Sequence, residues 1–138
     1  MIRGTLDVGL AIKDYLLTTP LGTEVPDIKV ETTVVFPTAD DRTEFIQILP
    51  KRSVDTKFFK KGFVEVNVYV PDKYENYPDS ARLRTLQRLS WDALENYLLN
   101  DGQDTWWVQM EGTPTLEKDD ALHCHFSNTR VVYQLFKH

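Results

Sequence analysis

The chain has 138 residues, of which 41% are hydrophobic and 12% aromatic, and it carries a formal charge of −5 with a pI near 5.1. This composition is typical of one globular domain and excludes a disordered chain, and the negative charge argues against nucleic acid and anionic lipid as partners. The single cysteine, Cys124, cannot form an internal disulfide, which fits a reducing compartment. Because no apolar run has the length of a signal peptide or a membrane span, we expect a soluble, cytosolic protein.

The first third of the chain predicts one short helix followed by two strands. Residues 7–17 place apolar side chains at the spacing of one helix face, and the threonine and proline residues that follow end the helix. Residues 28–36 alternate as in a half-buried strand and residues 45–49 form a short, mainly apolar strand; each stops at a proline, and only a polar turn separates them. We therefore expect these two runs to form a β-hairpin. The helix positions are Val8, Ile12, Tyr15 and Leu16, with Thr5 or Asp7 as the N-cap.

The middle of the chain carries the clearest pattern. Residues 62–70 alternate, with valine at every even position from 64 to 70, which predicts a strand with its valine face buried. The preceding residues 51–61 hold five basic residues and one acidic residue without a clear period, and we interpret them as a long loop. After the strand, residues 80–99 carry leucines on one helical face. We expect a long helix there, capped by Asp79 and ended by the Asn-Asp-Gly sequence of residues 100–102.

The last third of the chain predicts further strands. Residues 106–111 read as a strand, residues 112–114 contain glycine and proline and interrupt it, and residues 117–120 form a charged turn. Residues 121–136 alternate in two halves whose phase changes near residues 127–129. One bulged strand or two short strands fit this last segment.

These elements follow the order α-β-β-β-α-β-β. Strands separated by short connections favour a mainly antiparallel or mixed sheet, here of about five to six strands. We expect the two helices to pack on one face of that sheet, in a single α+β domain spanning residues 1–138.

The sequence His123-Cys124-His125 is the first candidate for a metal site, because histidine and cysteine are common ligands of zinc. On a strand, His123 and His125 share one face and Cys124 takes the other. A tetrahedral site needs two more ligands, and no second cluster of histidine and cysteine occurs in the sequence. We therefore expect a buried Cys124 with two surface histidines, and neither a metal nor another cofactor.

A magnesium-dependent nuclease is an alternative interpretation. Asp27 and Asp55 could hold the metal ion, while Lys57 steadies the attacking water or the phosphate. This chemistry requires the second carboxylate and the lysine on a strand, whereas Asp55 and Lys57 fall in the predicted loop. Because no other catalytic motif occurs in the sequence, we expect no enzyme.

The basic segment and a tryptophan pair are candidates for interfaces. The segment could meet the acidic turns of another subunit, or it could be a solvated loop, and the sequence leaves both open. Trp106 and Trp107 cannot both face inward on one strand, so one is available to an interface or is covered by the chain's own loops. A cleft near Trp106, Trp107 and Tyr69 would instead suit a small ligand-binding module. The members of the basic segment are Lys51, Arg52, Lys57, Phe58, Phe59, Lys60 and Lys61.

In the order of its elements and in the prolines that end several of them, the chain resembles the tail-terminator, or tail-completion, proteins of long-tailed bacteriophages and prophages. The resemblance covers most of the chain and is a matter of layout, with no set of catalytic residues to match. The segments that carry it are the helix before Thr19-Pro20-Leu21, the strand closed by Phe36-Pro37, the strand 45–50, the strand 61–72 and the helix from Ser80.

The resemblance implies a structural subunit of the phage neck that closes the tail tube. The resemblance implies assembly as a ring, with a hexamer as the expected size, and contacts with tail-tube and head-connector proteins. The resemblance also implies that the basic segment faces the lumen or a neighbouring ring. The expected location is the bacterial cytoplasm during assembly and then the tail or neck of the virion.

Overall fold

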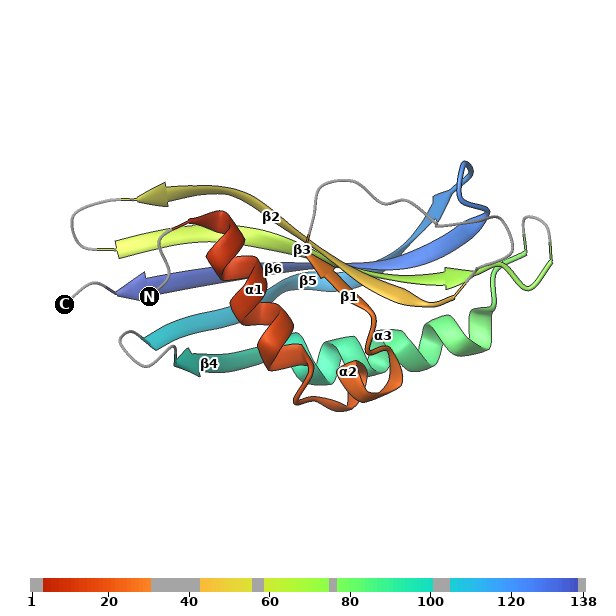
Figure 1. The fold of residues 1–138 in the computed structure, drawn as a ribbon, viewed down its shortest axis with the longest axis horizontal. Helices are drawn as coiled ribbons and strands as arrows, with labels where there is room; N and C mark the ends of the chain where they lie inside the picture. The colour runs from red at the N-terminus through yellow and green to blue at the C-terminus, as the bar shows by residue number, and fades with distance from the viewer. Residues whose placement is uncertain (1–3, 31–42, 56–58, 75–76, 101–104, 137–138) are drawn as a thin grey trace.

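The computed structural model describes residues 4–30, 43–55, 59–74, 77–100 and 105–136. These residues form three helices and six strands in the order α-α-β-β-β-α-β-β-β (Figure 1). The helices are α1 (Thr5–Leu16), α2 (Pro20–Glu24) and α3 (Ser80–Leu94), and the strands are β1 (Ile28–Val30), β2 (Phe45–Asp55), β3 (Phe59–Pro71), β4 (Asn96–Asn100), β5 (Thr105–Asp119) and β6 (Cys124–Phe136). The α+β class is confirmed, whereas the predicted order lacked α2 and β4.

The six strands form one curled, mixed sheet in the spatial order β1-β2-β3-β6-β5-β4. β1 runs parallel to β2, and the other neighbouring pairs are antiparallel. The predicted hairpin between residues 28–36 and 45–49 is wrong, because Ile28 to Val30 pair in parallel with Ile46 to Ile48. A tight turn cannot join parallel neighbours. Residues 31–36 of that predicted strand lie outside the described residues.

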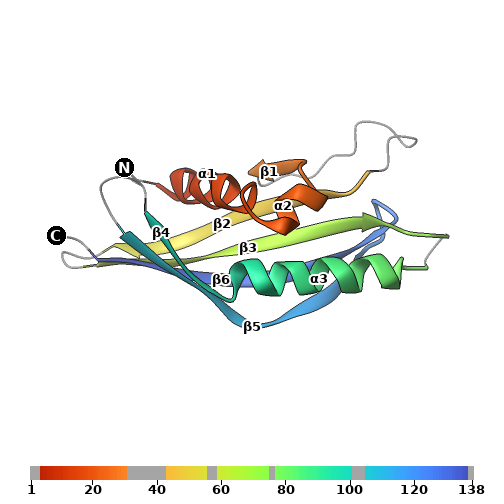
Figure 2. The ribbon, with the colours of Figure 1, turned by 90° about the horizontal axis from the view of Figure 1, so that it is seen from below.

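One face of the sheet carries the main core. The even-numbered valines of β3 are buried, as their spacing predicted, and buried residues of all three helices join them in one cluster. Figure 2 shows the helices on one side of the sheet, so three helices rather than two lie there. Within the described residues, no helix lies over the opposite face. Fully buried helix residues include Ile12, Leu16, Leu21, Leu86 and Leu94.

α1 lies close against the sheet because of a glycine. A Cβ atom at Gly9 would lie 2.5 Å from Cγ1 of Val30 and 2.8 Å from Cγ of Pro50. Gly9 lowers the helix propensity of α1, but its missing side chain allows the helix to approach β1 and β2. Asp7 acts at the start of the helix, where its carboxylate accepts a hydrogen bond of 3.2 Å from the Gly4 N–H.

α3 begins as predicted but ends early. The Asp79 carboxylate accepts a hydrogen bond from the Arg82 N–H, which confirms the N-cap. The helix stops at Leu94, and the predicted extension to residue 99 is wrong because Asn96–Asn100 form β4, paired with β5. Tyr97 packs toward the core and stacks on Tyr15 of α1 with ring centroids 3.8 Å apart. A sequence that suits either a helix or a strand is thus fixed as a strand by its neighbours.

The predicted long loop over residues 51–61 is also wrong. Lys51 to Asp55 belong to β2, and Phe59 to Lys61 belong to β3. The register shifts between Pro50 and Ser53, where proline supplies no N–H to the ladder, and this irregularity hides the alternation in the sequence. Residues 56–58, in the middle of the basic segment, lie outside the described residues.

β5 is longer than predicted, whereas β6 starts three residues later than the predicted segment 121–136. β5 continues through residues 112–114 by a shift in register between Glu111 and Thr115, with Gly112 at a φ of 74°. The predicted turn at residues 117–120 is therefore wrong over residues 117–119, which are still in β5. β6 is one continuous strand whose pairing with β3 shows no shift, so the irregularity lies in β5.

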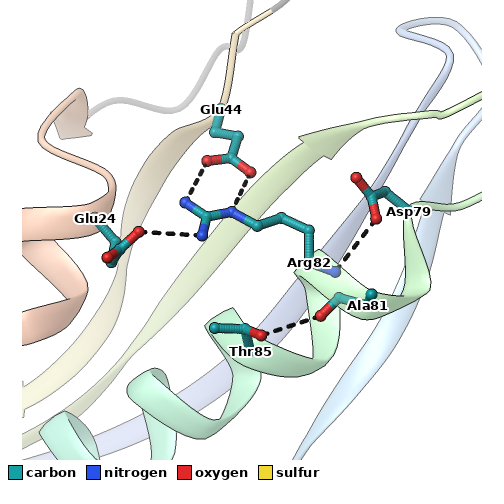
Figure 3. A network of polar contacts seen from close by, with 6 residues as sticks. All are labelled: Glu24, Glu44, Asp79, Ala81, Arg82 and Thr85. Atoms are coloured by element: carbon teal, nitrogen blue, oxygen red, sulfur yellow. Dashed lines mark hydrogen bonds and ion pairs between the residues drawn. The ribbon is translucent and has the colours of Figure 1, made fainter.

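Arg82 connects three distant segments (Figure 3). Its guanidinium donates two hydrogen bonds of 2.7 and 2.9 Å to the Glu44 carboxylate and one of 3.1 Å to Glu24. The hydrogen bonds that Arg82 donates to Glu44, and after them the one that it donates to Glu24, raise the pKa of Arg82 above its ordinary value. The residue therefore holds the first turn of α3 against the end of α2 and the residue before β2.

Candidate functional site

The face of the sheet opposite the helices is closed at one end by an aromatic stack. The Tyr69 ring lies 4.7 Å from that of Phe45 and 4.6 Å from that of Phe126, each measured between centroids. The Tyr69 hydroxyl donates a hydrogen bond of 3.3 Å to Gln47. Burial, followed by the charge of Asp119, raises the pKa of Tyr69 to about 12. Because Phe45 and Tyr69 are buried, this end forms a second, smaller core.

Toward the other end, the same face is hollowed into an open groove of about 620 Å³, which we call the sheet groove. Its apolar part comprises Phe63 of β3, Trp107 of β5 and Val132 of β6, with the exposed Lys61 and Glu111 beside them. The strand register explains this gathering, because Phe63 pairs with Val132 and Lys61 pairs with Gln134, the partner of Trp107. The remaining lining residues are Gly62, Gln109, Met110 and Gln134.

Polar contacts hold the aromatic side chains of the sheet groove in place. The Arg130 guanidinium lies over the Phe63 ring, 4.0 Å from its centroid, and its Nε is 3.9 Å from the Glu111 carboxylate. The Trp107 Nε1–H donates a hydrogen bond of 2.7 Å to the Asn96 side chain. The indole of Trp107 is nevertheless 40% exposed. An aromatic side chain that is oriented but still exposed to solvent suits contact with another molecule.

The lining of the sheet groove combines apolar surface with a few polar groups. Its lining holds apolar surface, one cation, one carboxylate and side-chain amides. Among the described lining residues there is no histidine, cysteine, serine or threonine that could serve as a base or a nucleophile. The arrangement therefore suits an apolar side chain of a partner, with charged groups at its border.

The structure brings together two of the interface candidates and places a third, Trp106, on the other face of the sheet. Lys61 and Trp107 both line the sheet groove, whereas Trp106 is buried on the helix side. Lys51 lies 3.6 Å from the carboxylate of Glu65 on the neighbouring strand. The other members of the basic segment, Arg52, Lys57, Phe58, Phe59 and Lys60, have side chains outside the described residues.

Phe63 and Val132 are site residues that the sequence analysis missed. The alternation of residues 62–70 already places Phe63 opposite the valine face. The alternation indicates on which face of the sheet Phe63 lies, but not which residues lie beside it. Those depend on the position of β6 between β3 and β5, which local alternation cannot predict. The predicted cleft near Trp106, Trp107 and Tyr69 is not formed, because Trp106 is buried in the main core and Tyr69 in the aromatic stack.

In the structure, the two aspartates of the nuclease hypothesis lie near opposite ends of β2. The Asp27 carbonyl oxygen accepts a hydrogen bond from the N–H of Ile46, near the start of β2, whereas Asp55 is the last residue of β2. At the rise of an extended strand, the two residues are roughly 30 Å apart. Lys57 lies outside the described residues. The convergence that two-carboxylate metal binding needs is therefore not formed by Asp27 and Asp55.

The predicted pair of surface histidines is only half correct. His123 is exposed, in the turn before β6 with a φ of 51°, but His125 is buried in β6 and its Nδ1 lies 2.5 Å from Oδ1 of Asp72. Cys124 is buried, as predicted, beside the aromatic stack. Among the described residues, no group of three or more histidine, cysteine, aspartate or glutamate side chains could hold a metal ion.

No family model matches the chain, and no curated protein matches it significantly. Among solved structures, one chain that carries only an identifier as its description aligns with a TM-score of 0.51 at 14% identity, covering 93% of this chain and 95% of that chain. At this identity the likeness shows the fold alone, which is shared over almost the full length of both chains. None of the described helices is both long enough and apolar enough to cross a membrane.

Proposed function

We propose that the chain is a structural subunit of a bacteriophage or prophage neck, of the tail-terminator or tail-completion kind, which acts by binding copies of itself. The observation that carries the proposal is the sheet groove on the face without helices, with Phe63, Trp107 and Val132 gathered in it. From the resemblance in the layout of elements we propose that these subunits form a ring of six. The same resemblance suggests tail-tube and head-connector proteins as the partners of the ring. The protein is not an enzyme in this proposal.

The physical reason is the unequal burial of the two faces. A half-exposed tryptophan on an open sheet face is a typical centre of a protein interface, because burying it removes a large apolar area from water. The nearby charges of Lys61, Glu111 and Arg130 could orient a partner and reject incorrect ones. Self-association through this face would complete a layer that the single chain leaves open.

Light scattering over a range of protein concentrations tests this proposal. We expect the wild-type chain to form a discrete oligomer, and we expect Trp107→Ala combined with Phe63→Ala to shift the mass toward the monomer. Leu10→Ala is a matched control, because Leu10 is an exposed apolar residue of α1, away from the sheet groove. A wild-type chain that stays monomeric at its highest soluble concentration contradicts the proposal, as does an oligomer that the two changes leave intact.

A small ligand-binding module is the second candidate, favoured by the size of the sheet groove. Its volume of about 620 Å³ falls within the usual range for ligand pockets. This candidate predicts that aromatic or aliphatic probe molecules quench the fluorescence of Trp107 and that Trp107→Phe abolishes the response. A monomeric wild-type chain with saturable quenching would favour the module over the assembly subunit.

A further inference from the structure

β4 forms one edge of the sheet, because it comes last in the strand order β1-β2-β3-β6-β5-β4 (Figure 1). Within the described residues, no strand pairs with its outer side. Leu98, in the middle of β4, is 71% exposed, more than any other large hydrophobic side chain of the described residues. An edge strand presents backbone N–H and C=O groups with which a further strand can pair. β4 therefore combines such a row of backbone groups with exposed apolar surface.

The hydrogen bonds between β4 and β5 decide which backbone groups of β4 point outward. The Met110 N–H donates a hydrogen bond of 3.2 Å to the Glu95 carbonyl oxygen, just before β4 begins, and the register of the two strands is regular. Hydrogen-bonded and non-hydrogen-bonded pairs alternate along an antiparallel ladder. The backbone of Tyr97 therefore bonds to β5, whereas the N–H and C=O groups of Asn96 and Leu98 point away from it.

β4 lacks the features by which proteins usually protect an edge strand. Its sequence, Asn96–Asn100, contains neither a charged residue nor proline. The other edge strand, β1, is only three residues long and carries Lys29. The stretches of β2 and β5 that extend past β1 and β4 are each bulged and contain a proline, Pro50 and Pro114. Short length, charge, bulges and proline all oppose pairing with another chain, so among the described edges β4 is the one suited to it.

We propose that β4 pairs antiparallel with β4 of a second copy of this chain, about a two-fold axis at Leu98. The sequence Asn-Tyr-Leu-Leu-Asn has the same pattern of amide and apolar residues in both directions. In this register, Leu98 lies opposite Leu98 of the second copy. Tyr97 lies opposite Leu99, and Asn96 lies opposite Asn100. Amide therefore faces amide and apolar faces apolar in every cross-strand pair, and no like charges meet.

The backbone and the side chains favour the same register. Antiparallel pairing requires each outward-pointing residue to meet another one, which this register provides for Leu98 and Asn96. A shift by two residues would also meet this requirement, but it would leave the end of β4 without a partner. Leu98 is the cross-strand neighbour of Trp107, on the face of the sheet without helices. The added strand therefore covers Leu98 and continues this face into the second copy.

This inference goes beyond the proposed function, because it names a contact at the edge of the sheet rather than in the sheet groove. It rests on the proposed function only in that both require copies of the chain to associate. A two-fold contact closes on itself and joins two copies. The sheet groove of each copy then remains available for further subunits.

Disulfide trapping tests the pairing and its register. The Cα atoms of a hydrogen-bonded antiparallel pair are about 5.5 Å apart, within the range of a disulfide. Leu98→Cys should therefore form a covalent dimer under mild oxidation, which a non-reducing gel detects. Asn96→Cys alone should not, because its two copies would be roughly 13 Å apart along the strands. Mixing Asn96→Cys with Asn100→Cys should give the covalent dimer again.

Two controls identify cross-links that do not depend on β4. The wild-type chain should give no covalent dimer, because its single cysteine, Cys124, is buried. Leu10→Cys places a thiol at an exposed position of α1 and should stay monomeric on the gel. A cross-link of Leu98→Cys therefore counts only in excess of that of Leu10→Cys.

A matched pair of substitutions at Leu98 tests the backbone hydrogen bonds. Leu98→Pro removes an N–H that points away from β5, and should raise the dissociation constant from sedimentation velocity by about tenfold or more. Leu98→Val keeps both the N–H and an apolar side chain, and should associate like the wild type. Thermal unfolding of both variants should stay close to that of the wild type, because an edge strand tolerates proline where its N–H faces solvent.

The outcomes distinguish this inference from the proposed function. If the wild type associates but Leu98→Cys gives no more covalent dimer than Leu10→Cys, the inference is overturned while the proposed function stands. Leu98→Pro that associates as tightly as the wild type, or Asn96→Cys that cross-links alone as well as Leu98→Cys, also overturns the inference. If Leu98→Cys cross-links but the changes in the sheet groove leave the oligomer intact, the groove contact fails and the edge contact stands. A wild type that never associates overturns both.

Discussion

Trp106 and Trp107 are neighbours in the chain but lie on opposite faces of one sheet. Trp106 is 1% exposed and contacts the Tyr133 ring within the main core, whereas Trp107 is 40% exposed in the sheet groove. Side chains of one type therefore serve stability on one face and are available for binding on the other. The comparison teaches that the two faces should respond differently to the same substitution.

The largest expected effect is at the buried tryptophan. Trp106→Ala should lower the free energy of unfolding by about 3–5 kcal/mol, because it leaves a large cavity under the helices. Urea denaturation followed by circular dichroism measures this change. Trp106→Phe keeps an aromatic ring there and should cost less than the alanine variant. An alanine variant as stable as the wild type would contradict the assignment of this face to the core.

Arg82 tests how the helices are held over the covered face. Arg82→Met should destabilise the fold by about 1–2 kcal/mol, because the Glu24 and Glu44 carboxylates lose a partly buried partner. Arg82→Lys keeps the charge but cannot bind Glu44 through two nitrogens, so it should recover only part of the loss. Denaturation midpoints at low and high salt measure both variants. Full recovery by lysine would show that charge alone matters.

Tyr69 tests the part of the face opposite the helices that is buried by the aromatic stack. The pKa of Tyr69 is about 12 in the folded chain, against about 10 for an unfolded tyrosine. Between these values only the unfolded chain releases the proton, so the stabilisation is complete below pH 10 and is lost as the pH rises toward 12.

Tyr69→Phe should therefore make the fall in stability above pH 10 shallower. The slope should not vanish, because burial also raises the pKa of Tyr97 and of Tyr15. Urea midpoints measured at a series of alkaline pH values test this expectation. An unchanged slope in the variant would show that Tyr69 titrates as it does in the unfolded chain.

The smallest effect on stability is expected at the exposed tryptophan. Trp107→Ala removes a solvent-exposed ring and its hydrogen bond to Asn96, and should change the free energy of unfolding by less than about 1 kcal/mol. The same urea assay compares it with Trp106→Ala. A loss as large as that of Trp106→Ala would mean that Trp107 is structural, and would weaken its role as an interface residue.

Local patterns predicted several parts of the fold correctly. The valines of residues 62–70 are buried as expected, Asp79 caps α3, and one tryptophan of the pair faces outward. These features depend on neighbours in the sequence, so a short window contains the necessary information. The α+β fold class and the approximate number of strands in the sheet followed from the number and spacing of such sequence segments.

Features that depend on distant pairing were predicted wrongly. Tyr97 and Leu98 fit a continued helix, but their backbone groups pair with β5. The basic residues after Pro50 lack a visible period, yet they extend β2 opposite β3. In both cases a strand's hydrogen bonds come from another segment, which a local pattern cannot report.

The sequence by itself determined which side chains of each clear strand are turned toward the core, because a strand alternates its side chains with a fixed period of two. Only the tertiary structure decided which strands are neighbours, and with that the gathering of Phe63, Trp107 and Val132 in one groove. The reason is physical: alternation is a local property of the backbone, whereas strand order is set by packing and hydrogen bonds between residues far apart in the chain.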